Sequence, residues 1–184
     1  VASVALMLLA GLAGVALADE GMWLFNVPPT AQVKAKYGFT LTKQWLDHVR
    51  LSSVRFNNGG SGSFVSPNGL TMTNHHVGAT CIHQLSTGGQ DYMKTGFYAR
   101  TQAEEAKCPD LELNVLQEIE DVTAKVNAGV KTGMSVADQA QAQRAAMSVV
   151  EQGCSTGANT RCDVMTLYSG AMYHLYKYKK YTDV

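Results

Sequence analysis

The chain has 184 residues, of which 46% are hydrophobic, and its 15 basic and 15 acidic side chains give a formal net charge of zero. The balanced charge offers no basic surface of the kind that binds nucleic acid or anionic lipid, so we expect neither partner. The apolar content excludes an intrinsically disordered chain, and the length suits one domain of ordinary size.

The first stretch of the chain, residues 1–18, is small and aliphatic and ends in an Ala-Leu-Ala motif that an acidic pair follows. This pattern predicts a secretory signal peptide, with cleavage after Ala18 and a mature chain that begins at Asp19. The alternative is a membrane anchor, but a bilayer span needs about 20 apolar residues. We therefore expect a periplasmic or secreted protein with no membrane segment in its mature form. Since neither Met nor a basic segment precedes Val1, we also expect the front of the chain to be missing.

Two helices are predicted within residues 31–56. Gly38 separates them, and Thr42 is a candidate N-cap for the second helix, in which Trp45 and Val49 share one side. The boundary between helix and strand is expected near Ser53, where the pattern changes to alternation of apolar and polar residues.

Strands are predicted at 53–56, 62–66 and 70–74, and the tripeptide Pro67-Asn68-Gly69 supplies a hairpin turn between the last two.

Further along the chain the patterns predict one long extended segment, one helix and a pair of strands. The expected ranges are 110–122, 135–152 and 162–184. In the first, Leu111, Leu113 and Val115 alternate as one buried row. In the second, Ser135 is a candidate N-cap, with Asp138 three residues on. The last range ends in mid-strand without a turn signal, so we expect the chain to be cut at its C-terminus as well.

Export makes the four cysteines candidates for disulfide bonds. Cys154 and Cys162 bracket a short loop, so a local bridge between them is the favoured pairing. Cys81 and Cys108 are then left as the second pair. Four cysteines allow three pairings, and the sequence alone does not choose among them.

Two adjacent histidines, His75 and His76, follow the predicted hairpin. With Cys81 and His83 they form a set of possible metal ligands within nine residues. However, neighbours on a strand point to opposite faces, and structural zinc ligands usually come in spaced pairs. We therefore expect no metal and no cofactor.

A catalytic role is the second interpretation of the histidine pair. A serine hydroxyl attacks a peptide carbonyl only when a neutral imidazole accepts its proton and a carboxylate orients that imidazole. In double-barrel serine proteases the histidine lies just past a strand of the first barrel, where the loop faces the cleft. The predicted hairpin over 63–74 delivers His76 to such a position. On spacing alone, two ordinary loop histidines remain the simpler interpretation.

Four motifs carry a resemblance to a known family. They are DEGMWLFN at 19–26, NNGGSGSFVSPNGLTMTNHHVG at 57–78, TGFYA at 95–99 and LYKYKKYTDV at 175–184. Together they resemble peptidase family S46, the dipeptidyl-peptidase 7 and 11 group of exported bacterial exopeptidases. Part of the second motif is also similar to HtrA-type proteases, which would not share the first or the last motif.

The resemblance implies a fold that is mainly β with helices. This chain would supply the first part of a chymotrypsin-like double β-barrel, and the helix at 135–152 would begin an inserted helical domain. It also implies that residues 19–184 are the N-terminal part of the catalytic domain and that His76 is the general base, with His75 and Asn74 in supporting positions. The catalytic Asp and Ser would follow Val184, so the 184-residue piece alone is expected to be inactive.

The activity implied by the resemblance is that of a serine-type dipeptidyl-peptidase. It would release dipeptides from the free N-terminus of oligopeptides through an acyl-enzyme, and the full-length protein would be a homodimer. The alternatives are an HtrA-like serine endopeptidase and a non-catalytic secreted binding domain. The preference for acidic or hydrophobic side chains next to the cleaved bond is left open.

The chain itself contains residues of the types that could substitute for the catalytic partners. The candidate carboxylates are Asp91, Asp110 and Asp121, and the candidate hydroxyls are Ser61 and Ser63. No pattern predicts that one of the carboxylates lies behind His76. The two serines lie on the same hairpin as His76, where we expect them to serve the turn and the strand. Some family members carry Cys where Ser61 and Val77 stand here, so that disulfide is not expected in this chain.

Overall fold

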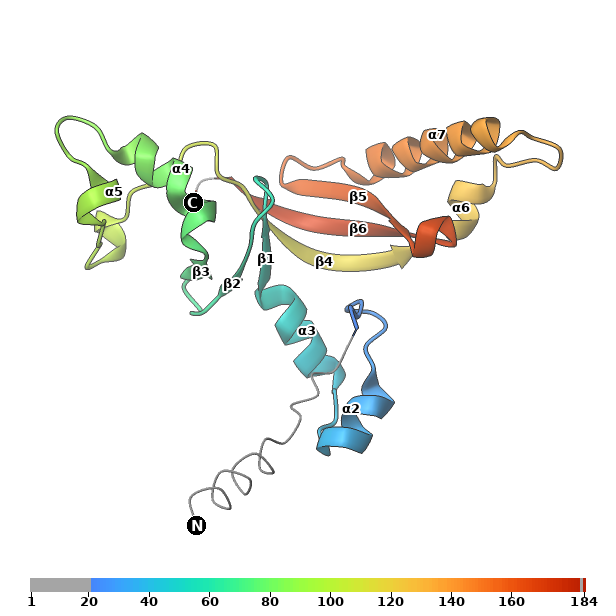
Figure 1. Cartoon of the computed structure of the whole chain (residues 1–184), viewed down its shortest axis with the longest axis horizontal. Helices are drawn as coiled ribbons and strands as arrows, with labels where there is room; N and C mark the ends of the chain where they lie inside the picture. The colour runs from blue at the N-terminus through green and yellow to red at the C-terminus, as the bar shows by residue number, and fades with distance from the viewer. Residues whose placement is uncertain (1–20, 183) are drawn as a thin grey trace, which may run out of the picture. The chain divides into compact units, whose positions relative to one another are not determined.

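A computed structural model describes residues 21–182 and residue 184 (Figure 1). The chain divides into two compact units, an N-terminal unit that ends at Phe39 and a main unit over 40–184. The predicted signal peptide at 1–18 lies outside the described residues. Among the helices that the structure does describe, none combines the length and the apolar character that crossing a bilayer requires.

The described part of the N-terminal unit contains a short bridge between Leu24 and Val27 and the helix α2 (Thr30–Tyr37). Gly38 ends α2 with a positive φ of 67°, a conformation that glycine adopts without steric cost, so the predicted break at this position is confirmed. No residue described in this unit is buried, and the side chain of Trp23 is 55% exposed.

The main unit alternates short strands with helices. In chain order its elements are α3 (Lys43–Ser52), β1 (Ser53–Phe56), β2 (Ser61–Phe64), β3 (Thr71–Thr73), α4 (His75–Leu85), α5 (Tyr92–Thr95), η1 (Gln102–Glu104), β4 (Leu113–Asp121), α6 (Thr123–Asn127), α7 (Val136–Cys154), β5 (Thr160–Leu167), η2 (Tyr168–Gly170) and β6 (Met172–Tyr181). The predicted cap of α3 is confirmed, because the Thr42 hydroxyl accepts a hydrogen bond from the Trp45 amide at 3.2 Å.

The six strands form one antiparallel sheet in the order β3-β2-β1-β4-β6-β5. β4 pairs with β1 on one side and β6 on the other, and thereby joins an N-terminal three-stranded part to a C-terminal hairpin. Within the described residues the outer strands β3 and β5 do not pair with each other, so the sheet is open. The architecture is therefore a mixture of helices and antiparallel sheet, and the barrel implied by the resemblance is not closed here.

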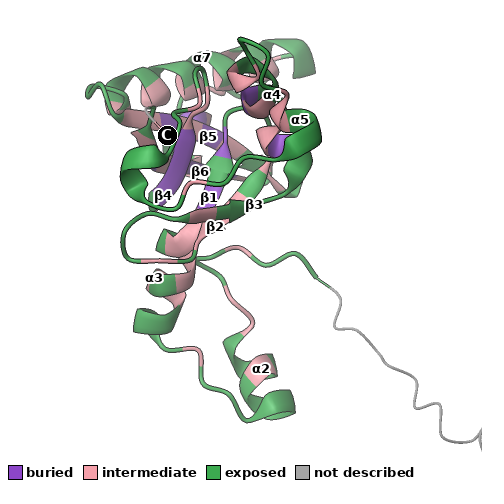
Figure 2. Cartoon of the chain, turned by 90° about the vertical axis from the view of Figure 1, so that its left-hand side faces the viewer, coloured by how far each residue is buried: buried purple, intermediate pink, exposed green. Residues whose placement is uncertain are grey.

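Two clusters of buried side chains form the core of the main unit, and Figure 2 shows that burial is concentrated on the strands. The first cluster lies where α6 and α7 pack on β5 and β6; it includes Val126, Val164 and Leu175. The second includes Leu113 and Val115 of the predicted buried row, together with residues of β1 and α4. Leu113 and Val115 are thus placed as expected.

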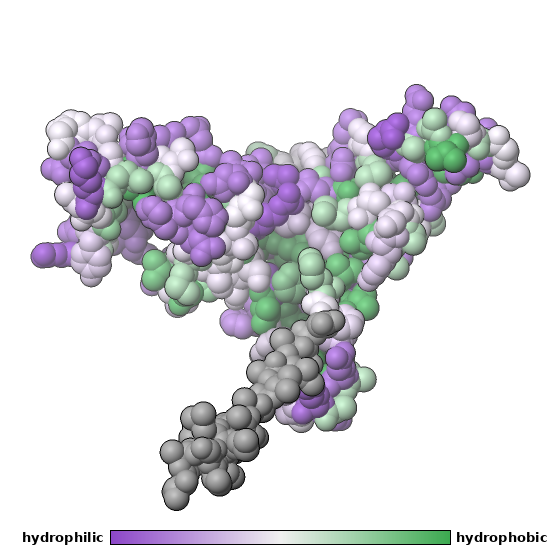
Figure 3. Space-filling view, in the orientation of Figure 1, coloured by the Kyte–Doolittle hydropathy of each residue, from purple (hydrophilic) through white to green (hydrophobic). Residues whose placement is uncertain are grey.

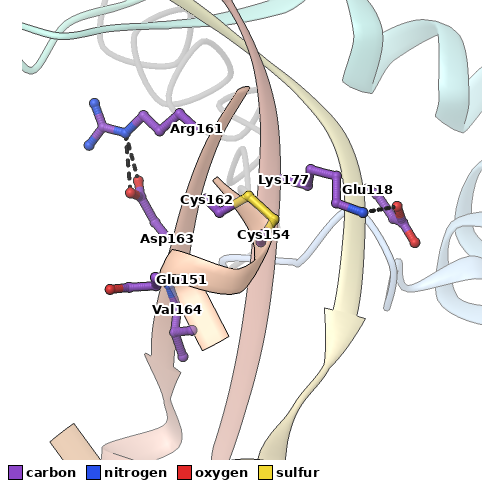
Figure 4. The surroundings of a disulfide bond; sticks show 8 residues. All are labelled: Glu118, Glu151, Cys154, Arg161, Cys162, Asp163, Val164 and Lys177. Atoms are coloured by element: carbon purple, nitrogen blue, oxygen red, sulfur yellow. Dashed lines mark hydrogen bonds and ion pairs between the residues drawn. A yellow bond between two sulfur atoms is a disulfide. The ribbon is translucent and has the colours of Figure 1, made fainter. Parts of the chain in front are cut away.

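The predicted helix at 135–152 is α7, and its cap is confirmed because the Ser135 hydroxyl accepts from the Asp138 amide at 3.2 Å. This helix covers one face of the sheet within the main unit (Figure 1). Its last residue, Cys154, forms a disulfide with Cys162 at the start of β5, as predicted (Figure 4).

A second contact in the same region fixes the end of α7. Close to the disulfide, a carboxylate oxygen of Glu151 accepts a hydrogen bond from the Val164 amide at 2.7 Å. The disulfide and this hydrogen bond both join the C-terminal turn of α7 to β5, so the helix end has a fixed position on the sheet.

Candidate functional site

The candidate site begins where the β2–β3 hairpin ends. The turn at Pro67-Asn68-Gly69 closes as predicted, with the Val65 amide donating to the Leu70 carbonyl at 2.8 Å. Gly69 adopts a φ of 88°, which explains why glycine stands at this point of the turn. β3 then leads through Asn74 directly into α4, whose first two residues are the histidine pair.

The placement of the histidines on a loop or strand was wrong, because His75 and His76 form the first turn of an 11-residue helix. The local sequence does not predict this helix, since Val77, Gly78 and Thr80 all have low helix propensity. Consecutive helical residues point about 100° apart, so the two imidazoles still diverge. Both are exposed, and neither has a hydrogen-bond partner among residues 21–182 and 184.

The opposite face of α4 attaches the helix to the sheet. Val77 and Cys81, one turn apart, are 3% and 5% exposed, and Val77 belongs to the buried cluster of Phe56 and Leu113. Cys81 forms a disulfide with Cys108, in the segment before β4, which confirms the second predicted pair. An imidazole in the first turn of α4 is therefore presented to solvent by a helix whose inner face is anchored.

Asn74 occupies the N-cap position of α4 with extended backbone angles, but its side chain makes no capping hydrogen bond to a described residue. The first turn instead closes through the backbone, where the Val77 amide donates to the Asn74 carbonyl at 3.0 Å. Asn74 is exposed, as are the two histidines that follow it.

The other residues considered as catalytic partners have local roles. The Asp91 carboxylate caps α5, the Asp121 carboxylate accepts from the Thr123 amide at 2.9 Å, and Asp110 lies in a tight turn with a φ of 64°. The Ser63 hydroxyl donates to the backbone carbonyls of Phe64 and of Ser52 at the end of α3, and Ser61 is exposed on β2. None of these side chains is hydrogen-bonded to His76.

The possible metal ligands do not converge either. Cys81 forms a disulfide, so it has no free thiolate for a metal ion. His83 lies two turns along α4 from His76. Among the residues that the structure describes, no group of three or more His, Cys, Asp or Glu side chains is arranged to hold a metal ion.

A cavity of about 720 Å³ lies beside the histidine pair. Thr73, three residues before His76, and Gly78, two residues after it, lie on its wall, whereas the imidazole itself does not. Most of the wall is apolar; the large side chains are those of Phe56, Phe64, Leu70, Leu111, Leu113 and Tyr181. Figure 3 shows apolar residues reaching the surface in the middle of the view.

A comparison with family models identifies the family to which this mixed helical and antiparallel chain belongs. The model of Peptidase S46 matches residues 18–184, which is nearly the whole chain. This chain belongs to peptidase family S46.

Curated relatives agree with the family. The chain is 35% identical over 187 residues to dipeptidyl-peptidase 7 of Porphyromonas gingivalis, a match that covers 96% of this chain and 26% of the relative. It is 32% identical over 184 residues to dipeptidyl-peptidase 7 of Porphyromonas endodontalis, covering 96% and 22%. The chain spans about a quarter of the length of these relatives.

A solved structure agrees with the fold. The crystal structure of Porphyromonas endodontalis DPP11 in complex with substrate superimposes with a TM-score of 0.71 at 26% identity, and the match covers 90% of this chain and 26% of that one. The Asp/Glu-specific dipeptidyl-peptidase of the same organism is 30% identical over 181 residues, covering 92% of this chain and 25% of the relative.

Proposed function

We propose that the protein containing this chain is a serine-type dipeptidyl-peptidase that releases dipeptides from the free N-terminus of oligopeptides. The observation that carries the proposal is the S46 match over 18–184, which includes the histidine pair at the start of α4. The relatives reported above are dipeptidyl-peptidases by name. None of them favours an endopeptidase of the HtrA kind or a non-catalytic binding domain.

His76 acts as the general base in this proposal. Its imidazole accepts the proton of a serine hydroxyl while the serine oxygen forms a bond to the carbonyl carbon of the second substrate residue. The imidazolium then gives the proton to the leaving amine as the peptide bond breaks, which leaves an acyl-enzyme. Water repeats the cycle, with His76 taking its proton, and the dipeptide is released. His76 is exposed, and Thr73 and Gly78 on either side of it in the sequence line the cavity, which supports this role.

The serine and the orienting aspartate of the triad lie outside these 184 residues in this proposal, as the resemblance implies. The absence of any described carboxylate or hydroxyl bonded to His76 is consistent with that placement. The 184-residue chain by itself is therefore expected to be inactive, because nucleophile and base act as a unit.

We also propose that the open sheet is one part of a chymotrypsin-like double β-barrel. Two observations support this. The edge strand β3 is unpaired on its outer side within the described residues, and an apolar cavity lies on the sheet next to β2 and β3. Apolar surface and free strand edges of this kind are normally covered in a complete domain.

Export through a signal peptide at 1–18 remains part of the proposal, with a periplasmic or extracellular location. The two disulfides support it, because disulfide bonds persist in oxidising compartments. Mass spectrometry of the secreted protein is expected to find Asp19 at its N-terminus. A homodimer is proposed from the resemblance alone, and light scattering of the complete protein measures it.

The activity is tested with two peptides of the same sequence, one with a free N-terminus and one that is N-acetylated. The protein expressed from its complete reading frame is expected to release successive dipeptides from the free peptide only. Cleavage of the acetylated peptide at a similar rate would show an endopeptidase. No cleavage of either peptide, tested over acidic and hydrophobic side chains at the second position, would overturn the proposal.

A further inference from the structure

We propose that the turn between β1 and β2, residues 57–60, is a clamp that positions His76, with Asn58 and Gly60 as its positioning residues. The inference rests on the proposed function, because it concerns the placement of the general base. The turn carries the sequence Asn-Asn-Gly-Gly and contacts both α4 and the segment that leads into β4. We call it the NNGG turn.

The first contact of the clamp is a hydrogen bond to the first turn of α4. The side-chain amide of Asn58 donates to the backbone carbonyl oxygen of Val77 at 2.9 Å. Val77 directly follows His76, so this bond holds the backbone carbonyl of the residue next to the proposed base. The two residues are 19 positions apart, and the bond therefore ties the helix to a strand connection that it does not adjoin in sequence.

The second contact is the close approach of Gly60 to the side chain of Val77. A Cβ atom added to Gly60 would lie 2.3 Å from Val77 Cγ2 and 2.8 Å from Cγ1, far inside van der Waals contact. Val77 is 3% exposed and packs in the cluster of Val54 and Phe56. A larger residue at position 60 is therefore expected to displace the Val77 side chain, the NNGG turn or α4.

The NNGG turn also holds the segment before β4. The Asn57 side chain donates to the Asp110 carbonyl at 3.0 Å and accepts from the Glu112 amide at 3.1 Å. That segment carries Cys108, whose disulfide to Cys81 reaches the second turn of α4.

The three pieces form a closed ring of contacts. The NNGG turn is hydrogen-bonded to α4 at Val77. Cys81 of α4 is joined by its disulfide to the segment before β4, and that segment is hydrogen-bonded to Asn57 of the turn. A small cavity of about 110 Å³ lies between them, lined by Asn58 and Val77 among others. α4 is thus fixed at two points one turn apart, and the backbone of His76 cannot shift unless a member of the ring yields.

This ring matters for catalysis because a general base must lie within hydrogen-bond reach of the proton that it removes. A displacement of about 1 Å at a catalytic group costs on the order of 100-fold in rate. The exposed imidazole of His76 makes no hydrogen bond to a described residue, so its position depends on the helix backbone that the clamp holds.

The test uses Asn58→Ala and Gly60→Ala in the protein expressed from its complete reading frame. We expect kcat for dipeptide release to fall roughly 10- to 100-fold, with KM changed by less than about 2-fold, since substrate binding does not involve the clamp. The rate of labelling by a serine-reactive fluorophosphonate is expected to fall by the same factor, because it needs the same base. Val77→Ala added to Gly60→Ala removes the two clashing methyl groups and is expected to restore part of kcat.

Matched controls are Asn159→Ala and Gly153→Ala. Asn159 is an exposed asparagine in the loop before β5, and a Cβ added to Gly153 of α7 meets open space. Both controls are expected to keep the kcat of the parent protein. If Gly60→Ala fails to fold, Asn58→Ala carries the test, because it deletes one amide group and introduces no clash.

Two failures are distinguishable. If His76→Ala retains activity, the proposed function itself is wrong. If His76→Ala abolishes activity but Asn58→Ala and Gly60→Ala keep the parental kcat per folded enzyme, or lower only the melting temperature, the clamp is overturned and the NNGG turn has a purely structural role.

Discussion

The guanidinium group of Arg50 in α3 donates a hydrogen bond to the backbone carbonyl oxygen of Leu116 in β4, at 2.6 Å and across 66 positions of sequence. The same group also donates to the carbonyl of Gln117. β4 departs from regular pairing at this point, where its register shifts between Leu116 and Glu118. Arg50 therefore satisfies carbonyl groups at the irregularity and fixes α3 to the middle of the sheet, with its own charge balanced by Asp47 at 3.1 Å.

Replacing this arginine by methionine is expected to destabilise the protein. Arg50→Met keeps much of the side-chain length but removes the donors, so about 1.5–3 kcal/mol of unfolding free energy is lost, as for other hydrogen bonds to charged groups. Lys43→Met is the control, because Lys43 also pairs with Asp47 but its side chain is 88% exposed, and such a pair contributes about 0–1 kcal/mol. Equal falls in melting temperature for the two variants would contradict the role of Arg50.

The histidines of α4 are expected to differ in their importance for activity. His76→Ala lowers kcat by roughly three or more orders of magnitude if it removes the general base. His83→Ala is the control, because His83 is an exposed histidine of the same helix, two turns from His76. Its kcat is expected to stay at the parental value. Steady-state release of dipeptides measures both, and a comparable loss in His83→Ala would argue against a specific role for His76.

The two disulfides are expected to have separable effects. Cys81 and Cys108 bridge 27 positions and fix α4, whereas Cys154 and Cys162 bridge 8 positions and fix the end of α7. Removing either pair by substitution with alanine lowers stability, by about 2–5 kcal/mol in typical small exported domains.

Only the loss of the Cys81–Cys108 bridge is expected to lower kcat per folded enzyme as well, because only that bridge touches the helix of His76. Melting temperature and kcat are measured on both double-alanine proteins. A kcat loss in the Cys154→Ala/Cys162→Ala protein equal to that in the other would contradict the separation.

Acid is expected to destabilise the main unit through three surface carboxylates. The hydrogen bond from Lys43, followed by that from Arg50, lowers the pKa of Asp47 below its ordinary 3.8. The hydrogen bond from Lys177 lowers the pKa of Glu118 below 4.5, and hydrogen bonds from Thr123 lower that of Asp121 below 3.8.

Because the folded state holds these groups ionised more strongly than the unfolded state does, the unfolded state binds more protons below about pH 4.5. Their stabilisation is complete above the ordinary pKa values and is lost as the pH falls through the lowered ones. The triple variant Asp47→Asn/Glu118→Gln/Asp121→Asn is expected to show a smaller fall in melting temperature between about pH 6 and pH 3. An unchanged acid dependence would contradict this assignment.

Several elements were predictable from short stretches of sequence. The Thr42 cap of α3, the strand at Ser53–Phe56, the Ser135 cap of α7 and the Cys154–Cys162 bridge all lie where the local pattern indicates. The two caps and the bridge join residues at most eight positions apart, and the strand pairs with β2 across six to ten positions. The resemblance to family S46, which rests on contiguous motifs, was confirmed for the same reason.

The surroundings of the candidate site were not predictable in this way. The helix that begins at His75 runs against the propensity of its own residues and is stabilised by burial of Val77 and by the bridge from Cys81. The Asn-Asn-Gly-Gly stretch is visible in the sequence, but its partner, the Val77 carbonyl, is not indicated by any spacing.

The sequence by itself determined the family of this chain, the helices and strands that caps and turns mark, and the candidate histidines His75 and His76. The tertiary structure alone decided that the pair begins a helix, that Gly60 lies against the side chain of Val77, and that Arg50 meets the irregularity of β4. The physical reason is distance along the chain. Caps, turns and alternation depend on neighbouring residues. The three features decided by the tertiary structure form only after segments that are far apart in sequence have come together in the sheet.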